Sequence, residues 1–331
     1  MALTKRLFKL IANRTLTRNY HVTVVGGASD VGQTIGLLLR TNPNIRKLVV
    51  HDTLDKTSGV VLDLSHVPVH SALQGYTGED TLDNALKNTD IVIAASGSPE
   101  KHGITEKERF NRNAEFIRRL CLKIAKLRPM PFVGITTEPL NTLVPMASEL
   151  LRNHGDYNPK KLFGITAVGA MRAQALYASE NNFNPDECIV PVIGGHSEKT
   201  LLPLISQSKP QCEMDEKKVR EFVNKVRKVG EFSTNSKKGW SPTLSVAYGA
   251  MLFTQGVLDA LDGRLAKVNA LVENNDFGTS FFSGLVNIDQ NGFCEMKRYT
   301  SITQLECNLL EQSIIELRKD VTRGKKILEL A

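Results

Sequence analysis

The sequence of 331 residues contains five cysteines, and no two of them form a Cys-x-x-Cys pair. Their odd number and wide spacing argue against a disulfide framework and against a zinc site, so we expect reduced thiols and no bound metal. No stretch approaches roughly 18 uninterrupted apolar residues, which predicts that the chain has no membrane span. Internal repeats and low-complexity tracts are also missing, and the length suffices for two globular domains.

Acidic residues are missing from the first twenty positions, which carry five cations: Lys5, Arg6, Lys9, Arg14 and Arg18. Large apolar side chains recur among these cations at roughly helical intervals. A basic, acid-free amphipathic segment is typical of a mitochondrial presequence, and a disordered basic tail is the alternative. We therefore expect residues 1–20 to direct the protein to the mitochondrial matrix.

The formal charge of +7 overstates how basic the rest of the chain is. Five of the 42 basic residues lie in the first segment, so the remaining chain carries 37 basic residues against 35 acidic ones. Such a balance gives no broad basic surface for nucleic acid or for an acidic membrane. We therefore expect neither of them as a partner.

A β-rich run at residues 21–25 leads through a glycine-rich turn into an apolar helix at residues 33–40. A turn of this kind brings backbone amides close to a pyrophosphate at the positive end of a helix dipole. Asp52 ends the next strand, where a carboxylate accepts hydrogen bonds from ribose hydroxyls and repels a 2′-phosphate. The pattern predicts NAD as the cofactor, with these cofactor-binding residues in the turn: Gly26, Gly27 and Gly32.

Residues 90–95 and 132–136 are predicted to form further buried strands, and amphipathic helices follow them at 110–127 and 142–154. Repeated strand-helix order predicts a doubly wound parallel sheet of the Rossmann type. Ligands of such a sheet gather at the carboxyl ends of its strands, so we expect Gly97 and Glu138 to border the cleft. We assign residues 21–165 to this NAD-binding domain.

The second half of the chain, residues 166–331, is predicted to form a second α+β domain that carries the substrate site and the dimer contacts. A capping box at Thr303 predicts the start of its last helix. Ser241 is expected to be the N-cap of another helix, with Pro242 in the first turn. The remaining predicted elements are helices at 166–181, 215–229 and 241–261, apolar runs around 189–193, and strands near 266–274 and 279–287.

His196 follows an apolar β-branched run and the pair Gly194-Gly195. Taken alone, a histidine in this setting is more often a hydrogen-bonded loop residue than a catalyst. Hydride chemistry on a nicotinamide, however, needs a group that gains and loses a proton near neutral pH, and histidine is such a group. We therefore predict that His196 is catalytic.

Further motifs follow one another along the chain: Val61-Leu62-Asp63-Leu64-Ser65-His66, Phe110-Asn111, Asn113-Ala114, Tyr157-Asn158-Pro159, Phe163-Gly164-Ile165-Thr166, Ile193-Gly194-Gly195-His196 and Pro203-Leu204-Ile205-Ser206-Gln207. With the glycine turn and Asp52, they resemble the mitochondrial-type malate dehydrogenases over essentially the whole length after residue 20. The resemblance implies a homodimer that interconverts L-malate and oxaloacetate with NAD, a reaction of the tricarboxylic acid cycle. It also implies that His196 transfers the proton and that Arg172 binds the substrate carboxylate next to the reacting carbon.

Several positions depart from the pattern of that family. The aspartate that would orient His196 falls at Gly169, and the asparagine after the sheet strand falls at Glu138. The family's active-site loop, Pro-Arg-x-x-Gly-x-x-Arg, carries Glu100 and Glu106 in place of its two arginines. Ser29 replaces the middle glycine of the turn, which predicts weakened NAD binding.

These departures leave three alternatives. A strongly impaired or inactive family member with a structural or regulatory role fits the selective loss of chemical groups best. An active malate dehydrogenase is the second alternative, and a dehydrogenase for a different 2-hydroxy acid is the third. In any of them, a heterodimer with an active relative is an alternative to the homodimer.

Overall fold

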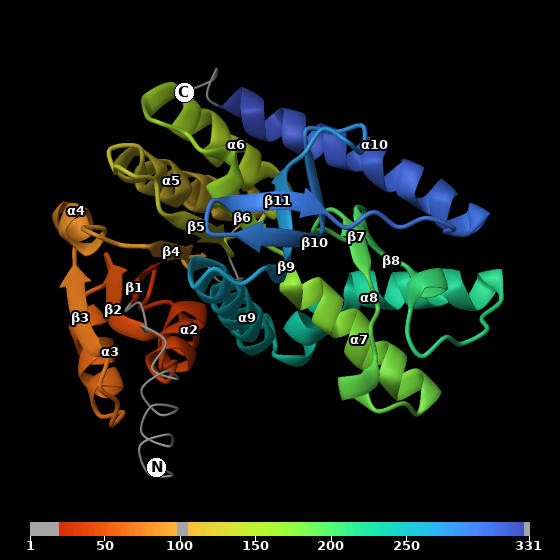
Figure 1. The fold of residues 1–331 in the computed structure, drawn as a ribbon, viewed down its shortest axis with the longest axis horizontal. Helices are drawn as coiled ribbons and strands as arrows, with labels where there is room; N and C mark the ends of the chain where they lie inside the picture. The colour runs from red at the N-terminus through yellow and green to blue at the C-terminus, as the bar shows by residue number, and fades with distance from the viewer. Residues whose placement is uncertain (1–19, 98–104, 328–331) are drawn as a thin grey trace, which may run out of the picture.

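The computed structural model describes residues 20–97 and 105–327. Residues 1–19 of the predicted presequence and Glu100 lie outside these residues, whereas Tyr20, the last residue of the predicted presequence, is the buried first residue of the first strand. Elements of the first half follow the strand-helix order that the sequence predicts (Figure 1). They are β1 (Tyr20–Val25), α2 (Asp30–Arg40), β2 (Ile45–Asp52), α3 (Thr57–Ser65), β3 (Ala72–Thr77), η1 (Glu79–Thr81), α4 (Leu82–Ala85), β4 (Ile91–Ala94), α5 (Glu106–Ile124), β5 (Phe132–Ile135), α6 (Leu140–His154), η2 (Pro159–Lys161) and β6 (Leu162–Ile165).

Six strands of this half lie in the order β3-β2-β1-β4-β5-β6, and each neighbouring pair is parallel. Strands β1, β4, β5 and β6 are fully buried, which explains why they are continuous apolar runs. In Figure 1, helices α5 and α6 lie on one side of these strands and α2 and α9 on the other. The prediction of a doubly wound parallel sheet is confirmed.

The second half adds antiparallel strands to the same sheet. Strand β9 pairs with β6 and with β10 in antiparallel fashion, and β10 pairs with both β7 and β11. The sheet therefore runs on from the parallel part into the α+β part. The elements are α7 (Ala167–Asn181), η3 (Pro185–Glu187), β7 (Val192–Gly194), β8 (Leu201–Pro203), η4 (Ile205–Gln207), α8 (Glu216–Ser236), α9 (Thr243–Leu261), β9 (Ala266–Glu273), β10 (Phe281–Asp289), β11 (Gly292–Met296) and α10 (Gln304–Lys326).

Two predicted helix starts are wrong. Pro242, and not Ser241, is the N-cap of α9, because its backbone is extended (ψ 92°) and leaves the helix to begin at Thr243. Helix α5 begins at Glu106, four residues before the predicted start, because Thr105 and Glu108 form a capping box.

Helix α9 is the one helix of the described residues that is long and apolar enough to cross a membrane. It packs against α2, α7 and β9, and a core helix of a globular protein has the same length and composition. This finding is therefore weak support for a span, and the absence of one remains a prediction.

Candidate active site and cofactor cleft

A cavity of about 1350 Å³ extends along the carboxyl ends of the parallel strands. It exceeds the usual 300–1,000 Å³ of a small-molecule site, as suits a long ligand such as a dinucleotide. Six predicted site residues line this cavity, whereas Gly27, Gly32 and Gly169 do not. The predicted residues in the lining are Gly26, Asp52, Gly97, Glu138, Arg172 and His196.

The glycine turn between β1 and α2 has no room for side chains. A Cβ atom on Gly26 (φ +83°) would lie 2.3 Å from the backbone nitrogen of Ser96, and one on Gly32 would lie 2.1 Å from the carbonyl oxygen of Gly26. Gly27 packs equally closely on Val50. Gly26 therefore brings the backbone to the cleft, and Gly27 and Gly32 hold α2 against the sheet.

Ser29 fits into this turn as the N-cap of α2. Its Oγ accepts a hydrogen bond from the backbone N–H of Gly32 (3.0 Å) and lies 2.7 Å from the carbonyl oxygen of Gly26 and 2.8 Å from that of Ala95. Its φ of −68° is ordinary for a residue with a side chain. The serine thus replaces the family's glycine without backbone strain and satisfies one free amide of the helix.

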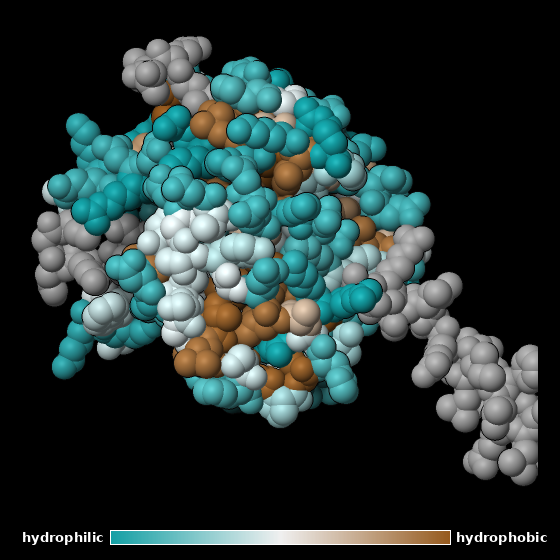
Figure 2. All heavy atoms as spheres, turned by 90° about the vertical axis from the view of Figure 1, so that its left-hand side faces the viewer, coloured by the Kyte–Doolittle hydropathy of each residue, from teal (hydrophilic) through white to brown (hydrophobic). Residues whose placement is uncertain are grey.

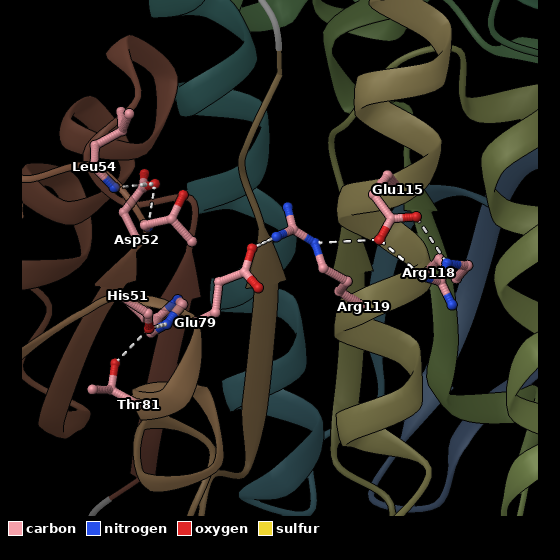
Figure 3. Close-up of polar contacts among 10 residues, drawn as sticks. His51, Asp52, Leu54, Glu79, Thr81, Glu115, Arg118 and Arg119 are labelled. Carbon is pink, nitrogen blue, oxygen red and sulfur yellow. Dashed lines mark hydrogen bonds and ion pairs between the residues drawn. The ribbon is translucent and has the colours of Figure 1, made fainter.

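Asp52 lies at the end of β2 with its carboxylate buried. One oxygen, Oδ1, accepts from the backbone amides of Thr53 (2.7 Å) and Leu54 (3.3 Å), and Oδ2 accepts from the amide of Ala28 (2.9 Å). Figure 3 shows the contact with Leu54. A carboxylate offers about four acceptor positions, so Asp52 keeps one for a ribose hydroxyl and fits the adenosine end of NAD.

Ion pairs connect the two walls of the cleft at this end. Arg119 of α5 pairs with Glu79 of η1, as Figure 3 shows, and Lys123 of α5 pairs with Asp83 of α4 (2.5 Å). All four residues are at least partly exposed, and such pairs contribute only about 0–1 kcal/mol each. Their effect is mainly to orient α5 along the cleft.

His196 follows β7 and enters the cleft with a largely buried side chain. Its backbone N–H donates to Oδ1 of Asn141 (2.8 Å), and its Nε2 lies 3.2 Å from Oε1 of Glu138. Asn141 also donates to the hydroxyl of Thr200 (3.0 Å) and to the carboxylate of Asp320 (3.0 Å). The segment at the start of α6 therefore holds both the backbone and the imidazole of His196.

The other imidazole nitrogen, Nδ1, is buried and has no hydrogen-bond partner among the described residues. A Cβ atom on Gly169 would lie 3.9 Å from this nitrogen and 2.9 Å from a terminal methyl of Leu201. Gly169 thus lies next to the unpaired atom, at the position where the resemblance places the orienting aspartate. The side chain that would fix the imidazole from this side is missing.

Arg172 lies one helical turn after Gly169 on α7. Burial lowers the pKa of its guanidinium, and the carboxylate of Glu138 opposes that effect. Its Nη1 lies 3.2 Å from the Cβ position of Gly230 on α8, so a larger residue there would press on the guanidinium. The structure thus brings Arg172 and His196 together in one cleft, as the sequence predicts.

Glu138 adds an anion to the cleft next to His196. Its Oε2 accepts from the backbone N–H of Leu140 (3.0 Å), and its carbonyl oxygen accepts from Nδ2 of Asn113 (2.8 Å). Glu106 is the exposed first residue of α5 and is not among the residues that line the cleft. Of the acidic replacements among the described residues, Glu138 is thus the one that lines the cleft.

Asn141 is a site residue that the sequence analysis missed. Asn113 is part of a family motif, but the sequence does not predict that its side chain donates a hydrogen bond to the carbonyl oxygen of Glu138. The position of Asn141, two residues after Pro139 in the first turn of the helix that follows β5, was the available signal. Among the described residues there is no group of three or more histidine, cysteine or acidic residues that would hold a metal ion.

Comparison with known proteins gives matches over both halves of the chain. Residues 20–164 match the NAD-binding domain of lactate/malate dehydrogenases, and residues 166–328 match the alpha/beta C-terminal domain of the same enzymes. Malate dehydrogenase 2, mitochondrial, of Arabidopsis thaliana is 34% identical over 307 residues, covering 92% of this chain and 90% of the relative. Mitochondrial malate dehydrogenase of Bos taurus is 31% identical over 313 residues, covering 94% and 92%.

Solved structures show the same fold at lower sequence identity. Malate dehydrogenase of Cryptosporidium parvum superposes with a TM-score of 0.79 at 20% identity, covering 93% of this chain and 99% of that one. Lactate dehydrogenase of the same organism, in complex with lactic acid and the nicotinamide cofactor, gives 0.79 at 19% identity, covering 95% and 99%. The first domain is an NAD-binding domain, which confirms the predicted cofactor. On the matches over both domains, the chain belongs to the lactate/malate dehydrogenase family.

Proposed function

We propose that the protein is a malate dehydrogenase family member that binds NAD but is strongly impaired or inactive as a dehydrogenase. The observation that carries the proposal is the surroundings of His196. Its Nδ1 is buried without a partner beside Gly169, and its Nε2 faces Glu138. With Nδ1 unpaired, no side chain fixes the imidazole from that side, and the Glu138 carboxylate holds the proton at Nε2, so this nitrogen is not free to exchange a proton with a substrate.

The size of the loss follows from a comparable system. In serine proteases, replacing the aspartate that orients the catalytic histidine lowers the rate on the order of 10⁴-fold. The acidic residues Glu100, Glu106 and Glu138 add repulsion toward a dicarboxylate such as malate or oxaloacetate. We therefore propose a structural or regulatory role that uses the fold, the cofactor and the assembly.

Assembly as a homodimer is part of the proposal. Figure 2 shows hydrophobic side chains gathered on the lower part of one face of the molecule. Exposed large apolar residues occur on three neighbouring helices and are Leu37 of α2, Leu62 of α3, and Leu244, Tyr248 and Leu252 of α9. Contiguous apolar surface of this kind marks protein interfaces, and a heterodimer with an active relative would use the same surface.

We further propose that residues 1–20 are a mitochondrial presequence, that residues 21–165 and 166–331 are the two domains, and that the protein acts in the mitochondrial matrix. The acid-free basic composition of the first segment supports this. Its relatives from Arabidopsis thaliana, Caenorhabditis elegans and Bos taurus are named mitochondrial.

The experiment measures NADH binding and turnover on the same preparation of residues 20–331. NADH is expected to raise the melting temperature progressively with its concentration c, because it binds the folded state and stabilises it by RT ln(1 + c/Kd). Oxaloacetate is expected to cause no NADH oxidation above that of an Arg172→Ala variant, which controls for contaminating host enzyme. Oxidation that the variant lacks would overturn the proposal of inactivity, and an unchanged melting temperature would overturn cofactor binding.

A further inference from the structure

The carboxylate of Glu138 is held at both of its oxygen atoms. Oε1 lies 3.2 Å from Nε2 of His196, and Oε2 accepts from the backbone N–H of Leu140, the first residue of α6. A negative charge next to the first turn of a helix is stabilised by the helix dipole. The carboxylate is therefore fixed in the cleft, although 54% of the side chain is exposed.

The groups around this carboxylate are those that attract an anion. Arg172 is half-buried in the same cleft, where burial lowers the pKa of its guanidinium and the nearby carboxylate of Glu138 opposes that effect. His196 offers Nε2 from the opposite element, the segment after β7. All three residues line one cleft, so the carboxylate of Glu138 lies among the same groups that a ligand carboxylate would contact.

We propose that Glu138 is a tethered carboxylate that occupies the anion position between Arg172 and His196 and so determines which ligands the cleft binds. Small carboxylic acids bind more weakly while Glu138 is in place. Ligands with a neutral or cationic group at this position are tolerated. The inference rests on the proposed role of the cleft as the substrate side of an NAD-binding site.

The role of Glu138 can be tested by removing its carboxylate. Arg172 keeps its place between α7 and α8 without Glu138, because its guanidinium packs on the bare surface of Gly230. Removing the Glu138 carboxylate should therefore leave an anion site formed by Arg172 and His196. Because Glu138 is half exposed and screened by water, we expect a gain of about tenfold in carboxylate affinity, and not the full effect of a buried charge.

The experiment titrates oxamate into residues 20–331 by calorimetry, with and without saturating NADH. Oxamate carries one carboxylate and a neutral amide, so distant acidic residues oppose it little. Glu138→Ala is expected to lower the dissociation constant of oxamate about tenfold relative to the unmodified protein. Glu138→Gln should give a smaller gain, because its uncharged amide still fills the position and can keep the contact with Leu140.

Two further variants test the assignment. Glu311→Gln neutralises an exposed carboxylate on α10 outside the cleft and should leave oxamate binding unchanged. Adding Arg172→Gln to Glu138→Ala should remove the gained affinity. Melting curves show whether each variant is folded. If Glu138→Ala does not fold, Glu138→Gln still tests the inference.

Several results would overturn the inference. They are oxamate binding that is equal in the unmodified protein and both Glu138 variants, an equal gain in Glu311→Gln, or a gain that survives Arg172→Gln. None of these results involves turnover. Oxaloacetate reduction by the unmodified protein, or a failure to bind NADH, would contradict the proposed function and is measured separately.

Discussion

Gly32 has no side chain, and this allows the start of α2 to pack closely on the turn after β1. A Cβ atom there would meet the backbone carbonyl of Gly26 at 2.1 Å, and backbone atoms cannot easily move away. We expect Gly32→Ala to lower the free energy of unfolding by about 1–3 kcal/mol and to weaken NADH binding. Chemical denaturation and NADH titration measure both effects.

Gly97 offers a control, because it lines the cleft and has no atom within 4 Å of its Cβ position. Gly97→Ala should leave the free energy of unfolding within about 0.5 kcal/mol of the unmodified value. Equal destabilisation by the two substitutions would contradict the packing explanation for the turn.

His21 and His51 are buried histidines whose free ring nitrogens have no partner among the described residues. Burial lowers the pKa of both below the ordinary 6.5, more than their contacts with Asn88 and Gly78 raise it. The unfolded chain therefore binds more protons than the folded one below pH 6.5, so stability is complete above that pH and falls as the pH drops through the folded pKa values.

The melting temperature should accordingly fall between about pH 7 and pH 5. The fall should be smaller in a His21→Gln, His51→Gln double variant, measured by calorimetry across that range. His70→Gln, which alters an exposed histidine, should leave the pH profile unchanged. A double variant with the full acid dependence would show that other groups cause it.

At the residue scale, the sequence predicted which residues line the cleft better than it predicted the contacts that they make. Gly26, Asp52 and His196 line the cleft where strand ends placed them, and Arg172 lines it from α7, where the resemblance placed it. The contact of Glu138 with His196 could not be predicted, because it joins segments 58 residues apart and depends on how α6 starts. The unpaired Nδ1 of His196 agrees with the departure noted at Gly169.

The capping box at the start of α10 also contacts a distant segment, the short helix η4. Glu306 is buried, its Oε2 accepts from the backbone N–H of Thr303 (2.9 Å), and its Oε1 accepts from that of Ser206 (3.0 Å). We expect Glu306→Ala to cost on the order of 3 kcal/mol, because two amides lose their partner. Thr303→Ala should cost about 1 kcal/mol.

Denaturant unfolding measures these costs, with Glu311→Ala as the control on an exposed part of the same helix. That substitution should change stability by less than about 0.5 kcal/mol. A cost for Glu306→Ala no larger than for Glu311→Ala would mean that the loop around Ser206 is held by other contacts.

Element predictions succeeded where the pattern was long or capped. The box at Thr303 gave the start of α10 correctly, and the apolar runs of β4 and β5 gave buried strands. Strand β3 was missed because its side chains are exposed or half-buried and carry no clear alternation. Strands β7 and β8 have three residues each, so pairing with β10 and with each other defines them.

At the scale of the whole molecule, the exposed apolar residues of α9 predict the assembly. Leu244 is 70% exposed and Leu252 is 40% exposed. The double substitution Leu244→Asp, Leu252→Asp should turn the proposed dimer into a folded monomer, because charge at the centre of an interface opposes its burial. Light scattering after size-exclusion chromatography measures the mass.

Ile315→Asp on α10 is the matched control, since that residue is also exposed (53%) and lies on another helix. It should leave the dimer intact. A monomeric unmodified protein, or a dimer that survives the double substitution, would contradict the proposed interface.

The fold class followed from the sequence because strand-helix alternation constrains the topology strongly. The continuation of the sheet from β6 into β9 did not, because antiparallel pairing between distant segments leaves no local pattern. What the whole molecule retains is therefore the family fold, and what it lacks are particular side chains around His196.

The most direct measurement compares oxaloacetate-dependent NADH oxidation by the unmodified protein with that of a variant carrying Gly169→Asp, Glu100→Arg, Glu106→Arg and Glu138→Asn. We expect no turnover from the unmodified protein, and measurable turnover from the variant that a further Arg172→Ala removes. Turnover by the unmodified protein at a rate similar to that of the variant would contradict the proposal that these positions disable the site.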